Sequence, residues 1–207
     1  YFDFYIITRD TDYCSDEVYP NVVSDAWNRW DAHTQIYYFS KENLSRKNIK
    51  VVVEKANCDF LYVNGIYSWY FSILPLLLFH KKIKTMVSAR GMLNPHAIGV
   101  KSTKKKLFLH LANAMGFYKN VSFHATNLQE AEHIKSFIGK DTQIKVAPNL
   151  PRVLMDDFVT KKKNKVVQFV NIARISKEKG TLNMLNAFQS VKNQVVLDLY
   201  GPVYDDN

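Results

Sequence analysis

The feature that most constrains the fold of this chain is a regular alternation of short apolar runs with segments of helical spacing. The apolar runs are bounded by turn formers and predict buried strands at residues 2–8, 35–39, 60–63, 85–88, 121–125, 144–147, 166–172 and 195–200. Helical spacing lies between them at residues 44–56, 67–80, 103–118, 127–138 and 181–191. In the helix at 127–138, Asn127 is expected to cap the amino end, with Glu130 reaching back in a capping box. Strands that alternate with helices form parallel sheets from βαβ units, so the sequence predicts an α/β, Rossmann-like fold with flanking helices.

Three segments interrupt this alternation. Residues 9–31 lack periodicity and predict an exposed loop, and residues 90–102, punctuated by glycines and a proline, predict a second one. Residues 148–165 hold two prolines and a basic run, which is typical of a linker. The predicted organisation is a domain with one parallel sheet at 1–150, a linker at 151–165 and the start of a second sheet-containing domain at 166–207.

Both ends of the chain predict truncated domains. Residues 166–207 supply only a strand, a helix, a strand and a short tail, which is too little to bury a core of their own. The first predicted strand begins at residue 2 and has no glycine-rich loop before it. We therefore expect the first domain to lack its first strand and loop, and the second to be incomplete.

Charge and composition narrow the function classes. The chain of 207 residues has 28 Lys and Arg against 19 Asp and Glu, and this net charge of +9 favours an anionic partner such as phosphate, nucleic acid or an acidic membrane face. Two cysteines without metal-ligand spacing fit a reducing, cytoplasmic compartment. The most apolar stretch, residues 71–79, contains a proline and is too short to span a bilayer.

The stretch RISKEKG, which ends at Gly180, places basic side chains at the turn between a predicted strand and a predicted helix. Free N–H groups at the start of a helix, together with Arg174 and Lys179, make a phosphate site. Gly180 allows the tight turn that a closely approaching anion requires. The alternative is that the lysines of an exposed turn simply point into water. Neither a P-loop nor a G-x-G-x-x-G motif is present in the sequence.

Four segments in order carry a resemblance to a known family. NIARISKEKG (171–180) resembles the turn that opens the carboxyl-terminal domain of retaining glycosyltransferases of family four, which have the GT-B fold. The segments SARGMLNPHAIGVKSTKKKLF (88–108), FHATNLQEAEHIKSFIG (123–139) and IKVAPNLP (144–151) are similar to that family in the same order.

This resemblance implies a two-domain hexosyltransferase that moves a sugar from a nucleotide diphosphate donor to an acceptor with retention of configuration. The first domain would be the acceptor side and the second would bind the donor nucleotide, whose diphosphate Arg174, Lys179 and Gly180 would hold. The acceptor or cleft loop would include Arg90, Gly91, His96 and Asn149. The resemblance implies no cofactor beyond the nucleotide sugar and no metal.

The sequence departs from the family pattern at one important position. Arg90 stands where many members have a histidine, and an arginine cannot act as a base at working pH, although it suits a phosphate or carboxylate. The paired glutamates that hold the donor sugar in the family would lie beyond Asn207. The catalytic groups therefore stay unassigned, and we expect this chain to be inactive alone.

The resemblance implies bacterial polysaccharide or cell-envelope biosynthesis, with a saccharide or lipid-linked acceptor. The protein is expected in the cytoplasm, with peripheral contact to an anionic membrane at its inner face. Lys104–Lys106 and the leucines after them would suit that contact, or form the solvated face of an ordinary helix. Two alternatives stay open: a basic α/β module that binds nucleic acid or another polyanion, and a GT-B sugar-nucleotide epimerase. No nucleic-acid-binding motif is present in the sequence.

Overall fold

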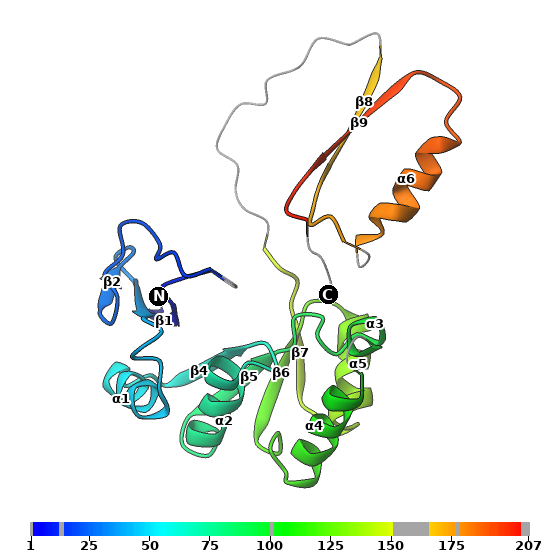
Figure 1. Ribbon diagram of the computed structural model, residues 1–207. Helices are drawn as coiled ribbons and strands as arrows, with labels where there is room; N and C mark the ends of the chain where they lie inside the picture. Colours follow the sequence, from blue (N-terminus) through cyan, green and yellow to red (C-terminus); the bar gives the residue numbers. More distant parts are fainter. Residues whose placement is uncertain (1, 13–14, 100–101, 151–165, 177–178, 204–207) are drawn as a thin grey trace. The chain divides into compact units, whose positions relative to one another are not determined.

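The computed structural model describes all residues except 1, 13–14, 100–101, 151–165, 177–178 and 204–207 (Figure 1). The chain divides into two compact units, residues 1–151 and 152–207. The predicted linker, residues 151–165, lies outside the described residues. No described helix combines the length and the apolar character that crossing a bilayer requires.

The centre of the first unit is a four-stranded parallel sheet. Its strands follow one another in space as they do in sequence: β4 (Phe60–Asn64), β5 (Lys84–Ser88), β6 (Val121–Ala125) and β7 (Ile144–Val146). The connections carry α2 (Leu74–Phe79), α3 (Pro95–Gly99), α4 (Ser102–Ala114) and α5 (Leu128–Ile138), which Figure 1 shows beside the strands. This confirms the predicted α/β class with a helix-flanked parallel sheet, consistent with a Rossmann-like fold.

One face of this sheet forms the main core. Buried Val63, Val87 and Phe123 pack in a cluster with residues of two helices, namely Leu109 and Ala112 of α4 and Ala131 and Ile134 of α5. The opposite face is more open, because Phe60 and Tyr62 of β4 are 42% and 44% exposed. The expectation of a buried strand therefore holds for only one face of β4.

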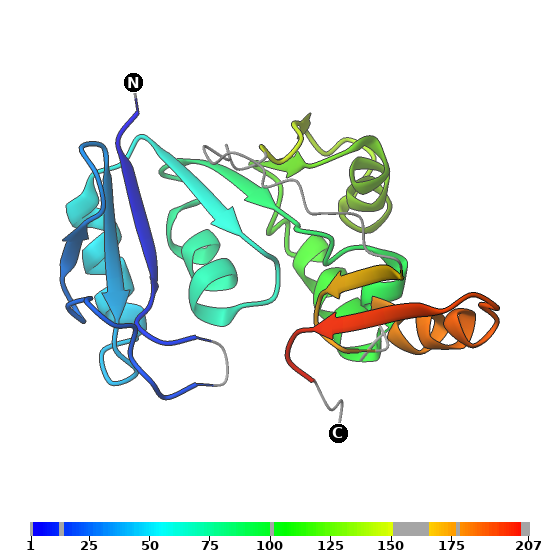
Figure 2. The ribbon, with the colours of Figure 1, turned by 90° about the horizontal axis from the view of Figure 1, so that it is seen from above.

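A second sheet precedes the parallel one. It consists of β1 (Phe4–Arg9), β3 (Thr34–Phe39) and β2 (Trp27–Arg29), with β3 in the middle (Figure 2). β1 runs parallel to β3, and β2 runs antiparallel to it. The prediction of one parallel sheet for residues 1–150 is therefore wrong, since the described residues form two separate sheets there.

The expected loop at residues 9–31 is also corrected, because it contains β2. Trp27 in β2 packs edge-on against Tyr37 and Tyr5, with ring centroids 5.3 Å and 5.4 Å away. Cross-strand aromatic contacts of this kind stabilise a short strand without any apolar periodicity. Asp10, in the same segment, is buried and accepts a hydrogen bond of 2.6 Å from the Ser24 hydroxyl.

The helix α1 (Arg46–Ala56) connects β3 to β4 and supports a second core. Buried Ile49, Val52 and Val53 of α1 cluster with Phe39 of the second sheet, and Leu61 of β4 packs against them. Ser45 begins the helix, since its side chain accepts a hydrogen bond from the backbone N–H of Asn48.

Two predictions need correction, one of a helix and one of a loop. The helix predicted at 67–80 begins as a π-helical turn, η1 (Trp69–Ile73), and continues as α2. Pro75 has no N–H for the usual bond to the residue four positions earlier, which explains why the regular pattern fails there. The predicted loop at 90–102 contains α3, which Pro95 begins, as proline favours the first helical position.

The second unit contains two parallel strands and one helix in its described part. β8 (Val167–Ile172) pairs with β9 (Val195–Tyr200), and α6 (Thr181–Gln189) connects them. Phe169 and Phe188 pack edge-on with ring centroids 5.2 Å apart, which joins the helix to the sheet.

Candidate functional site

The carboxyl ends of β4 to β7 meet at one edge of the parallel sheet, and a pocket lies there. Its volume is about 250 Å³, and it is lined by Arg90, Gly91, Asn94, Thr126, Asn127, Gln129, Glu130, His133 and Asn149. In open α/β sheets this edge is where ligands bind. The structure thus brings together three of the residues predicted for the cleft loop, Arg90, Gly91 and Asn149.

Arg90 ties three strand ends together. Its Nε donates to Oδ1 of Asn64, at the end of β4, over 2.8 Å, and its Nη1 donates to Oδ1 of Asn149, beyond β7, over 3.0 Å. Arg90 itself follows β5 in the left-handed conformation, with φ of 51°. A non-glycine residue in this conformation carries strain, so surrounding contacts must hold it there. The two bonds from its guanidinium are such contacts.

Glu130 fixes the same loop from the opposite side. It is buried, and its carboxylate accepts hydrogen bonds of 2.7 Å from the N–H of Gly91 and from both the N–H and the hydroxyl of Thr126. Burial alone would raise the pKa of Glu130, but these hydrogen bonds and nearby His124 outweigh burial and lower the pKa below its ordinary value. The carboxylate is therefore ionised and holds the glycine turn against the start of α5.

The amino end of α5 differs in one detail from the sequence prediction. Asn127 caps the helix as expected, since its Oδ1 accepts from the N–H of Glu130 over 2.8 Å. The predicted return bond of a capping box is absent from the described contacts of Glu130, whose carboxylate instead reaches Thr126 and Gly91. A tertiary donor thus takes the place of the local one.

The pocket combines a guanidinium with several amide side chains. At about 250 Å³ it is smaller than the roughly 300–1,000 Å³ of pockets that enclose drug-sized ligands. The guanidinium of Arg90 can donate hydrogen bonds to an anion, and the amides can both donate and accept. The arrangement therefore suits a small ligand rich in hydroxyl groups or a carboxylate, and Arg90 cannot serve as a base.

His124 lies near this edge, on β6. Its Nε2 is 2.8 Å from the carbonyl oxygen of Ala147, which can only accept, so Nε2 must carry a proton. The hydroxyl of Tyr62 lies 2.6 Å from Nδ1 and donates to it when the ring is neutral. His124 therefore links β4, β6 and the segment after β7, beside the pocket.

The predicted diphosphate residues lie in the second unit, in the turn between β8 and α6. Gly180 has φ of 67° and begins α6, and no atom lies within 4 Å of the position that a Cβ would take. Glycine is therefore needed for its conformation rather than for space. The backbone N–H of Lys179 donates to the carbonyl oxygen of Ser176 over 3.2 Å, and the Thr181 hydroxyl donates to that carbonyl oxygen over 3.2 Å as well.

The two described basic side chains of this turn are accessible to solvent. Arg174 and Lys179 are exposed, and no described side chain caps the amino end of α6. Lys177 and Glu178 lie outside the described residues. His96 falls in α3, and the structure does not describe its side chain. Among the described residues, no group of three or more His, Cys, Asp or Glu is placed to hold a metal ion.

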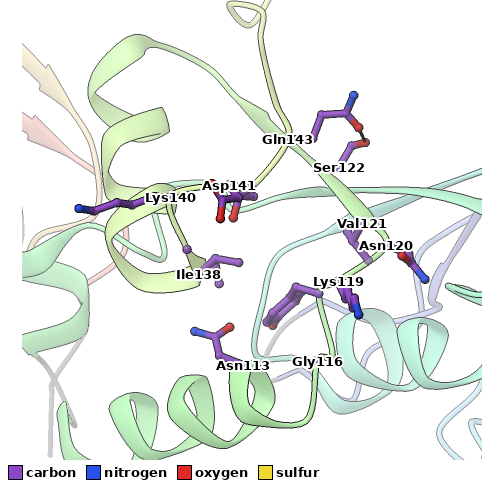
Figure 3. A pocket seen from close by; sticks show the side chains of 13 residues that line it. Asn113, Gly116, Lys119, Asn120, Val121, Ser122, Ile138, Lys140, Asp141 and Gln143 are labelled. Carbon is purple, nitrogen blue, oxygen red and sulfur yellow. Dashed lines mark hydrogen bonds between the residues drawn. The ribbon is translucent and has the colours of Figure 1, made fainter.

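A larger cavity, of about 740 Å³, lies at the other edge of the parallel sheet (Figure 3). Its walls include Asn113 near the end of α4, Ser122 at the start of β6 and Gln143 just before β7. The Ser122 hydroxyl donates to Gln143 over 2.8 Å, so these polar groups satisfy each other. This cavity lies away from the strand ends where ligands of such folds bind.

Sequence reasoning missed Glu130, Asn64 and Thr126 as parts of the site. Glu130 looked like a local helix cap, and Asn64 ends a strand without any special pattern. The one signal that pointed to Asn64 and Thr126 was position, since each comes directly after a predicted strand.

Comparisons of the chain with protein-family models, with curated proteins and with solved structures give no match.

Proposed function

We propose that the chain is part of a retaining glycosyltransferase of family four with the GT-B fold, in which the first unit belongs to the acceptor-side domain and the second to the donor-nucleotide domain. The donor would be a nucleotide diphosphate sugar and the acceptor a saccharide or a lipid-linked saccharide. The proposal rests on the sequence resemblance together with the geometry of the two strand-end turns.

The observation that carries the proposal is the β8–α6 turn. Arg174 and Lys179 are exposed within this turn, and Gly180 opens α6 in a left-handed conformation. The amino end of a helix presents backbone N–H groups and a partial positive charge, and both favour a phosphate group. Two added cations suit the double charge of a diphosphate better than that of a single carboxylate.

The chemistry of this turn is electrostatic. As the glycosidic bond of a nucleotide sugar breaks, negative charge grows on the departing diphosphate. Cations and N–H groups already aimed at the diphosphate stabilise that charge without reorganisation. Such a turn can assist departure without a metal ion.

The pocket of the first unit supports an acceptor role. Arg90 is held by Asn64 and Asn149, and Gly91 is held by Glu130, so the donors around the pocket are fixed before a ligand arrives. Preorganised donors lose less freedom on binding than mobile ones. A hydroxyl-rich acceptor, or one that bears a carboxylate, matches these groups.

The proposal is tested by a nuclear magnetic resonance titration of the ¹⁵N-labelled chain. UDP-glucose, GDP-mannose and inorganic pyrophosphate are added separately, and duplex DNA serves as a competing polyanion. We expect the nucleotide sugars to shift the amide signals of Arg174, Lys179 and Gly180. The variants Arg174→Ala and Lys179→Ala should lose these shifts. Shifts caused by DNA but by neither nucleotide sugar would contradict the proposal and favour a polyanion-binding module.

A further inference from the structure

The longest stretch of the chain without acidic residues surrounds the helix α4. Between Asp59 and Glu130, residues 60–129 contain no Asp or Glu and nine Lys or Arg. Nine is also the net charge of the whole protein, so the excess of positive charge can be assigned to this stretch alone. A surface built from it attracts anions without competition from its own carboxylates.

α4 presents an apolar stripe to solvent. Leu107, Leu111 and Met115 follow one another at four-residue spacing and are 57%, 51% and 78% exposed. The N–H of Met115 donates to the carbonyl of Leu111 over 2.9 Å, so the helical path continues to the last of the three. Side chains four residues apart lie on one face of a helix. The opposite face, with buried Leu109 and Ala112, packs into the core.

Lysines border this stripe. Lys104 and Lys106 are exposed, whereas Lys105 turns inward, donating from Nζ to the carbonyl of Ala97 over 2.6 Å. The ion pairs found in the described residues all involve other cations, so the charges of Lys104 and Lys106 are not neutralised by a neighbouring carboxylate.

More lysines lie at the far end of the helix. The rings of His80, which ends α2, and Phe117, which follows α4, lie 6.5 Å apart. Exposed Lys81 and Lys82 come directly after His80, and exposed Lys119 comes two residues after Phe117. The stripe thus has basic residues near both of its ends.

We propose that this α4 surface, made of Lys104, Lys106, Leu107, Leu111 and Met115, binds the surface of an anionic lipid bilayer. Leucine and methionine side chains would enter the boundary between headgroups and acyl chains, while the lysine ammonium groups contact lipid phosphates. A nucleic acid would satisfy the lysines but leaves the apolar stripe in water, which is why the structure favours a bilayer. This inference stands on the α4 surface alone and does not depend on the glycosyltransferase proposal.

Flotation of the whole chain with lipid vesicles tests the inference. Vesicles of phosphatidylcholine alone are compared with vesicles that also contain phosphatidylglycerol, at low and high salt. We expect binding only to the anionic vesicles, and weaker binding at high salt. Binding to neither kind of vesicle, or equal binding to both, would overturn the inference.

Paired variants separate the two contributions. Leu107→Gln/Leu111→Gln should lower the partition coefficient about tenfold or more. Lys104→Gln/Lys106→Gln should lower it about fivefold per lysine. The matched controls are Leu128→Gln/Leu150→Gln, at positions that are 76% and 91% exposed, and Lys47→Gln/Lys55→Gln on α1. These controls should bind vesicles as the unchanged chain does, and melting temperatures check that every variant is folded.

A second titration, with duplex DNA, distinguishes the other polyanion. The bilayer inference fails if the Leu107→Gln/Leu111→Gln variant binds both vesicles and DNA with the affinity of the unchanged chain, while the Lys104→Gln/Lys106→Gln variant binds both more weakly. The surface would then recognise polyanions in general. If vesicle binding follows the expected pattern but nucleotide sugars give no signal shifts, the bilayer inference stands and the glycosyltransferase proposal fails.

Discussion

Replacing Glu130 by glutamine should destabilise the first unit strongly for a single-atom-sized change. The carboxylate accepts three hydrogen bonds of 2.7 Å, two from backbone N–H groups and one from a hydroxyl. A glutamine keeps one acceptor and places an NH₂ group against a donor. Hydrogen bonds to charged groups contribute about 1.5–3 kcal/mol each, and an unsatisfied buried donor costs about 1–3 kcal/mol. We expect a loss of about 2–4 kcal/mol in the free energy of unfolding.

Urea unfolding followed by tryptophan fluorescence measures this loss in the first unit, where Glu130 lies. All three tryptophans of the chain, Trp27, Trp30 and Trp69, lie in the first unit. The control is Glu132→Gln, two residues further along α5, where the carboxylate is exposed and pairs with Lys135 over 2.9 Å. Exposed pairs of this kind contribute about 0–1 kcal/mol. The two variants should therefore differ clearly at neutral pH.

The lowered pKa of Glu130 determines how its contribution to folding stability changes with pH. Its pKa in the folded chain is lower than the ordinary value of 4.5, so its stabilising contribution is fully present above that pH. The contribution is lost as the pH falls through the folded pKa, because protonation removes the charge in the unchanged chain too. The stability difference between the unchanged chain and Glu130→Gln should thus shrink below pH 4.5. A difference no larger than that of Glu132→Gln, or one that grows in acid, would refute this reasoning.

Three further results are expected. Gly201→Ala should destabilise the second unit by at least about 2 kcal/mol, because its Cβ would lie 2.0 Å from the carbonyl oxygen of Ala173. Gly180→Ala meets no atom within 4 Å and should cost only about 1–2 kcal/mol. Hydrogen exchange of the β8 and β9 amides measures both losses, and equal losses would contradict this prediction. Nitrogen chemical shifts of His124 should show the Nε2–H tautomer in its neutral form, and Tyr62→Phe should move the Nδ1 signal; an Nδ1–H tautomer would contradict the assigned bonds. The chain alone should transfer no sugar in a radiolabel assay with a panel of nucleotide sugars, because transfer needs groups from both domains in one geometry; robust turnover would contradict that expectation.

The strands of the parallel sheet could be predicted because their apolar runs are continuous and flanked by turn formers. Each of β4 to β7 lies within two residues of its predicted range. β2 could not be predicted, because three residues have no periodicity and the strand depends on contacts between Trp27 and rings distant in sequence. A separate pair of sheets was likewise hidden, since strand spacing along a chain does not say which strands pair.

The site was predictable in part. The resemblance of their segments to a known family pointed to Arg90 and Asn149, and the structure brings both to one pocket. Glu130 was interpreted as a local cap, because local spacing reveals only partners close in sequence. Thr126 is such a partner, whereas the hydrogen bond from Gly91 to Glu130 depends on the packing of α5 against the sheet. A buried carboxylate with a partner 39 residues away cannot be recognised from local spacing.

The central claim, that the β8–α6 turn holds a donor diphosphate, is tested most directly by kcat/KM in an enzyme that carries both complete domains. Arg174→Ala and Lys179→Ala should each lower kcat/KM roughly thirty- to a thousand-fold, or about 2–4 kcal/mol, with unchanged melting temperatures. Lys177→Ala should have a much smaller effect, since the family pattern turns that position toward solvent. If Lys177→Ala proved as costly as Lys179→Ala, or if the losses followed lost stability, the cations would serve the turn itself and the claim would be wrong.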